Sequence, residues 1–182
     1  MTTFALVTVI ASIIVLAGFL AVSIRRYGLL SSYSAYAVPW DKDVPIHNMH
    51  IWSIFTFAIA ALFMPALIER GQGNPWQFLG FFVPLYLIMV ALFPLEDPKP
   101  DDTPADVKRK KNNKIIHVAS AICCAVAVVL WAGIVCHLWW VCILSLVIIS
   151  FAAYATKSID TSMTFWGEMA LFLTGYTAVL IG

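Results

Sequence analysis

Charge is scarce in this sequence. Charged residues make up 12% of the 182 residues and hydrophobic residues 62%, whereas a soluble domain carries roughly 25% charged residues. With a mean hydropathy of +0.89, the chain has too little polar surface for a soluble globular fold. The shortage also argues against nucleic-acid binding, because the one basic run, 108–111, is short and no base-stacking groove accompanies it.

Cysteine is sparse and lacks the spacing of a metal or redox site. The four cysteines include no CxxC pair and no Cys/His zinc-finger pattern. We therefore expect free thiols packed among helices, since cysteine behaves as a small hydrophobic residue. Histidine motifs are missing too: there is no HxxxH and no HExxH, and the nearest spacing is His47-Asn-Met-His50. A zinc site would have to be assembled from several segments.

Long apolar runs are what the sequence has in abundance. About 20 mostly apolar residues are needed for a helix to cross the hydrocarbon of a bilayer, and six segments qualify. These predicted spans are Phe4–Ile24, Ile51–Ile68, Trp76–Pro94, Ile115–Val135, Leu138–Thr156 and Thr164–Ile181. A signal peptide would have a basic region before its apolar run, and the first segment has none. We therefore expect this segment to stay in the protein as a membrane span. The prediction is one all-α domain, 1–182, an integral membrane bundle of six transmembrane helices.

The basic residues predict the orientation. Ten of the 11 lysines and arginines fall in the first, third and fifth connections between spans, and only Arg70 falls in the second. Cytoplasmic loops carry the excess of Lys and Arg. We therefore expect connections one, three and five in the cytoplasm and both termini outside, in an inner or plasma membrane.

The two long connections have different characters. Residues 27–40 contain no charge but many hydroxyls and aromatic rings, so this stretch is expected to lie in the membrane interface or to fold back over the bundle. Residues 95–113 contain three prolines and many charges and are expected to form an exposed linker. The short second and fourth connections predict antiparallel hairpins of spans two with three and four with five.

A set of titratable residues falls at the predicted cytoplasmic ends of four spans. His50, Asp97, His117 and Glu168 belong to spans two, three, four and six. Glu168 is the only carboxylate well inside an apolar run, so it is expected to face the bundle and to have a partner, such as His117, His50 or Ser120. We expect the four to line one pocket; the alternative is that they are ordinary interfacial residues.

Three roles fit such a set. Histidines with a carboxylate and an open position make a hydrolytic zinc site, in which His50, His117 and Glu168 would be ligands. His and Glu along a cavity also make a proton relay. The third role is structural, because a His–Glu pair can join two helices.

Four short elements resemble a group of uncharacterised small six-span bacterial membrane proteins. They are Ser-Ser-Tyr-Ser-Ala-Tyr (31–36), the end of the third span, Ile-Ile-His-Val-Ala-Ser (115–120) and Phe-Trp-Gly-Glu-Met-Ala-Leu-Phe-Leu (165–173). More remotely, the plan is similar to the CREST superfamily of alkaline ceramidases and adiponectin-type receptors, which have seven spans and a Ser, an Asp and three His around zinc. This sequence departs in its six spans and in lacking Ser-x3-His and a final HxxxH. The resemblance implies zinc with Asp97 as base or orienter, Ser34 as oxyanion donor and Glu168 in place of a histidine.

The sequence leaves three classes of function. A non-catalytic membrane subunit or lipid-binding scaffold is favoured, because the chain is small, its soluble loops are short and no sharp motif is present. The alternatives are a metal-dependent lipid or amide hydrolase and a small proton- or ion-coupled transporter or channel. The expected partners are membrane lipids, with a homo-oligomer or a larger membrane complex as further options.

Overall fold

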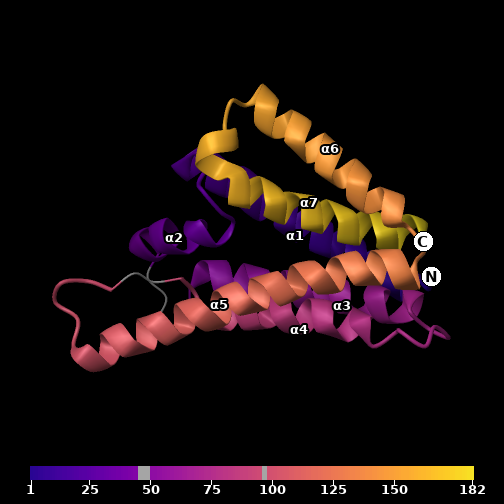
Figure 1. Ribbon diagram of the computed structural model, residues 1–182, viewed down its shortest axis with the longest axis horizontal. Coiled ribbons are helices and arrows are strands. Elements are labelled where there is room, and N and C mark those ends of the chain that lie inside the picture. The colour runs from indigo at the N-terminus through magenta and orange to yellow at the C-terminus, as the bar shows by residue number, and fades with distance from the viewer. Residues whose placement is uncertain (45–49, 96–97) are drawn as a thin grey trace.

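The computed structural model describes residues 1–44, 50–95 and 98–182, and this part of the chain is helical without strands (Figure 1), as the sequence predicts. The elements are α1 Thr3–Tyr27, η1 Ser34–Tyr36, α2 Ala37–Asp43, α3 Ile51–Arg70, α4 Leu79–Leu92, α5 Pro104–Leu130 with the π turn η2 Trp131–Val135, α6 Trp139–Ala155 and α7 Ile159–Ile181.

Four of these helices are long and apolar enough to cross a membrane: α1, α3, α5 with η2, and α7. The other two apolar helices, α4 with 14 residues and α6 with 17, are shorter. At 1.5 Å per residue they measure about 21 and 26 Å, against about 30 Å of hydrocarbon. By length and composition four described helices are candidate membrane spans, and each of the six predicted spans overlaps one described helix.

Apolar side chains cover the outside of the bundle. Phe151 on α6 is 73% exposed, and Phe81 on α4 is 50% exposed. In water such a surface would be unfavourable, since monomeric soluble proteins rarely expose apolar patches beyond a few hundred Å². Lipid tails are a suitable solvent for it.

Residues 1 and 182 lie at the same end of the bundle (Figure 1). The hydroxyl of Thr2 donates to Oε2 of Glu69 at 2.6 Å, which fixes the start of α1 to the end of α3. Nε of Arg70 donates to the carbonyl of Val179 at 2.7 Å. This side chain therefore satisfies one of the carbonyls that the last turn of α7 leaves without a helical partner.

The helices form a row and a pair. α1, α3, α4 and α5 pack side by side in that order, and α6 packs on α7. α7 meets the row mainly through α5, with smaller contacts to α1 and α3 (Figure 1). The hairpin predicted for the second and third spans is therefore present as α3–α4, whereas the one predicted for the fourth and fifth spans is wrong, because α6 leaves α5 and packs on α7.

The divergence of α6 from α5 has a local cause. The chain passes through the π turn η2 and then through His137, whose φ is +57°. Trp139 at the start of α6 folds back on Gly133 so closely that a Cβ there would lie 2.4 Å from the indole ring. A short connection in the sequence thus makes a corner instead of a tight hairpin.

The two long connections are more ordered than charge and proline content suggest. Residues 104–113, expected to be linker, form the first turns of α5. Thr103 caps this helix by accepting from the N–H of Asp106 at 3.2 Å, and Pro104 occupies a first-turn position, both of which favour helix initiation. The first connection folds back over the bundle, one of its two expected placements, and buries Tyr33 and Tyr36.

Candidate functional site

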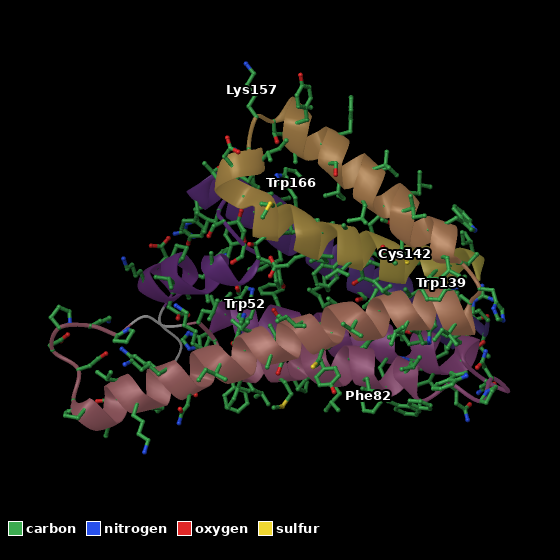
Figure 2. The ribbon with its side chains drawn as sticks, viewed as in Figure 1. Trp52, Phe82, Trp139, Cys142, Lys157 and Trp166 are labelled. Carbon is green, nitrogen blue, oxygen red and sulfur yellow. The ribbon has the colours of Figure 1, made fainter. Side chains whose placement is uncertain are left out.

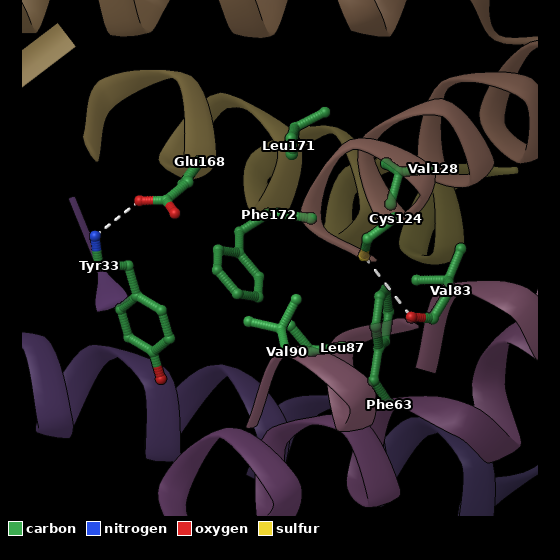
Figure 3. Close-up of a pocket in the computed structure, with 11 residues that line it drawn as sticks. Tyr33, Phe63, Val83, Leu87, Val90, Cys124, Val128, Glu168, Leu171 and Phe172 are labelled. Atoms are coloured by element: carbon green, nitrogen blue, oxygen red, sulfur yellow. Dashed lines mark hydrogen bonds between the residues drawn. The ribbon is translucent and has the colours of Figure 1, made fainter. Parts of the chain in front are cut away.

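A cavity of about 70 Å³ lies where α7 meets the row of helices (Figure 3). A single water needs about 10–15 Å³ on the same measure, so the cavity has room for several water-sized groups. Most of its wall is aliphatic or aromatic. The principal apolar residues are Phe63, Val83, Leu87, Val90, Leu171 and Phe172. The polar groups come from Tyr33, Cys124 and Glu168.

Glu168 brings the one ionisable carboxyl group to this cavity. It projects from α7, and its Oε2 accepts a hydrogen bond from the main-chain N–H of Tyr33 at 2.6 Å (Figure 3). The predicted interior placement is confirmed, but the partner is a main-chain amide and not His117, His50 or Ser120. No lysine, arginine or histidine among the described residues forms an ion pair with it.

Tyr33 is held so that its amide faces Glu168. The Thr56 hydroxyl donates to the carbonyl of Trp52 at 2.8 Å, and so it accepts from the Tyr33 hydroxyl at 3.0 Å. Burial raises the pKa of the Tyr33 phenol well above its usual value, so the hydroxyl keeps the proton that it donates. The ring also packs edge-on against Phe19 at 5.7 Å.

A second hydrogen bond, this one between main-chain groups, joins the first connection to α7. The backbone of α7 is non-helical at Ser162, with φ −138° and ψ 28°. Three residues later, the N–H of Phe165 donates to the carbonyl of Ser31 at 2.9 Å, outside its own helix. The segment 31–33 is thus tied to α7 at both ends, and it closes one side of the cavity.

Cys124 supplies the third polar group. Its Sγ donates to the carbonyl of Val83 at 3.6 Å (Figure 3), which links α5 to α4. The four cysteines are free thiols, as expected from their spacing. Sequence reasoning missed Tyr33 and Cys124 as cavity residues, because the Ser-Ser-Tyr-Ser-Ala-Tyr segment does not single out Tyr33, Cys124 belongs to no motif, and their meeting depends on how the helices pack.

His117 lies beside the cavity and not in its wall. It is buried, and its Nδ1 donates to the carbonyl of Phe93 at 2.8 Å. Its ring faces that of Trp52, with 6.1 Å between centroids. Ala121, which does line the cavity, is one helical turn further along α5.

The other predicted site residues lie elsewhere or outside the described part of the chain. His50 contacts Asp41 through Nδ1, next to α2. Ser34 is buried, and its hydroxyl is 3.1 Å from that of Ser32. Asp97 falls outside the described residues.

The predicted ligand set is not brought together. Among residues 1–44, 50–95 and 98–182, no group of three or more His, Cys, Asp or Glu side chains could hold a metal, and His50, His117 and Glu168 each have a different partner. The wider site with Asp97 stays a prediction, as do the hydrolase and the transporter that depend on such groups.

No family model, curated protein or solved structure matches this chain. What the site can do follows from its own chemistry. An apolar wall with one acceptor group at its edge suits a ligand that is mostly hydrocarbon and carries a hydrogen-bond donor.

Proposed function

We propose that this chain is a non-catalytic, lipid-binding protein of a bacterial inner membrane, and that its ligand occupies the cavity between α7 and the row of helices. The carrying observation is the cavity itself, because its wall is almost wholly apolar and its one acceptor is Glu168. Ligand sites typically combine such walls with a few placed polar groups. α7 leans on the row chiefly through α5, so a membrane-dissolved ligand needs only a small separation of these two helices to enter.

In the proposed topology all six apolar helices, the four long ones and the shorter α4 and α6, span the membrane. The short α4 and α6 are flanked by tryptophans such as Trp76 and Trp139, which suit the membrane interfaces. Ten of the 11 basic residues belong to the end opposite the termini, where Lys157 lies at the turn between α6 and α7 (Figure 2). That end is placed in the cytoplasm and both termini outside.

Impermeant thiol labelling of intact cells tests this topology. A Gln72→Cys variant, at the end that holds the termini, should be labelled above the background of the native cysteines. A Lys108→Cys variant should be labelled only after the cells are made permeable. Labelling of the second variant in intact cells would refute the orientation.

Filling the cavity tests the binding function. The protein is placed in phosphatidylcholine nanodiscs with a dodecane derivative that carries a photoreactive diazirine, and labelled residues are mapped by mass spectrometry. Labelling should concentrate on segments 121–128 and 168–172, and Ala121→Phe should remove it. Leu146→Phe on the outer face of α6, where Leu146 is 57% exposed, is the matched control and should label as the unchanged protein does. Equal labelling of the cavity in Ala121→Phe would overturn the proposal.

A further inference from the structure

We propose that the ligand of this cavity is a membrane-soluble aliphatic amine, whose ammonium group binds Glu168 while its hydrocarbon chain contacts the apolar wall. This inference rests on the proposed function and narrows it to one chemical class. It is carried by the charge and hydrogen-bonding state of the groups that face the cavity.

The carboxyl group of Glu168 can accept further hydrogen bonds. Its Oε2 accepts one neutral donor, the N–H of Tyr33. Its other oxygen takes no hydrogen bond from a described residue and points toward the space between Tyr33 and Phe172 (Figure 3). A carboxylate can accept about four hydrogen bonds, and a charge removed from water is normally paired.

The remaining polar groups of the cavity are already engaged. The Tyr33 hydroxyl donates to Thr56, and the Cys124 thiol donates to Val83. When Glu168 is ionised, the wall offers no free donor among the described residues, and its free function is a negatively charged acceptor. In that state a ligand with an anionic head is repelled, and a ligand whose head only accepts hydrogen bonds finds no partner.

A cationic donor fits best. An ammonium supplies both the counter-charge and the N–H groups that the carboxylate lacks, and hydrogen bonds to charged groups are stronger than neutral ones. An alcohol of the same chain length supplies a donor without charge. The difference between the two kinds of hydrogen bond corresponds to about a tenfold preference for the amine.

Competition among three ligands of one chain length tests the inference. Dodecylamine, dodecanol and dodecanoate each compete with the diazirine probe in phosphatidylcholine nanodiscs, whose lack of net charge avoids enriching the amine at the membrane surface. We expect dodecylamine to compete at least about tenfold more strongly than dodecanol, and dodecanoate to compete least. Equal competition by the three would overturn the amine assignment and leave the binding function intact. Competition by none, together with no labelling of the cavity, would overturn both.

The variant Glu168→Gln tests whether Glu168 causes the preference for the amine over the alcohol. It keeps an acceptor of the same shape for the Tyr33 N–H, so the dodecanol competition should be unchanged, while the amine preference should disappear. Asp160→Asn removes a charge from the exposed first turn of the same helix and should leave the preference as it was. An amine preference that persists in Glu168→Gln would overturn the role of Glu168. If that variant does not fold, the comparison of the three ligands on the unchanged protein still decides the ligand class.

Discussion

Replacing Glu168 should loosen the first connection of the chain in a graded way. In Glu168→Leu the N–H of Tyr33 loses its acceptor, and this bond is 2.6 Å long and is made to a carboxylate. A hydrogen bond to a charged group contributes about 1.5–3 kcal/mol, so local opening should become roughly 10- to 150-fold more frequent. In Glu168→Gln the side-chain carbonyl can still accept a neutral hydrogen bond, which leaves about 0.5–1.5 kcal/mol of the interaction.

Hydrogen exchange measured by mass spectrometry on a peptide covering 31–36 reads this opening directly. Global stability is a poorer readout, because a leucine at this position also gains from contact with the apolar wall. The Phe165 bond to Ser31 remains in both variants, so the segment should open without detaching. Leu171→Ala, which changes the wall without touching the hydrogen bond, should leave exchange in this peptide unchanged. Unchanged protection in Glu168→Leu would refute the reasoning.

Two further predictions concern the ends of the bundle. Gly133→Ala should lower the free energy of unfolding by about 1–3 kcal/mol, the cost of overpacking, because the new Cβ would meet the ring of Trp139 at 2.4 Å. Thermal unfolding in detergent measures this loss. The control is Gly18→Ala, where a Cβ has nothing within 4 Å, and it should show no loss. The hydrogen bond from Lys110 and that from the main chain of Lys99 lower the pKa of Asp102. The stability that Asp102 contributes is then present above the unfolded value of about 3.9 and is lost as the pH falls through the lowered folded value. Exchange of a peptide covering 104–110 should therefore be faster in Asp102→Asn than in the unchanged protein at pH 7, and the two rates should converge once the pH falls below the lowered folded-state pKa of Asp102. A difference between them that grows with acid would contradict this.

Hydropathy predicted the helices well, because a membrane span must be both apolar and about 20 residues long. It could not locate the start of α5. The first turns of that helix are polar, and they are specified by the cap at Thr103 and by the Lys110–Asp102 ion pair at 2.7 Å, which are local features without a hydropathy signal. A Thr-Pro pair three residues before an aspartate was the available sequence signature of this cap.

The candidate site, too, could be predicted from the sequence only in part. The isolation of Glu168 in an apolar run predicted that it faces the interior, since a carboxylate in lipid is expensive. Its partner could not be predicted, because every residue has a main-chain N–H and only the fold decides which one arrives. The corner at Gly133 likewise determines that α6 packs on α7, and a connection's length alone does not reveal its angle.

The two hydrogen bonds between residues 31–33 and α7 have a consequence for biosynthesis. The first connection emerges from the ribosome early, yet Phe165 and Glu168, which receive it, are made more than a hundred residues later. At about 5–20 residues per second, the segment waits for several seconds or more without its two hydrogen bonds to α7. Closure of the cavity by this segment therefore depends on the arrival of α7. A nascent chain stopped before α7 should carry an unsealed first connection, which membrane quality-control proteases can recognise.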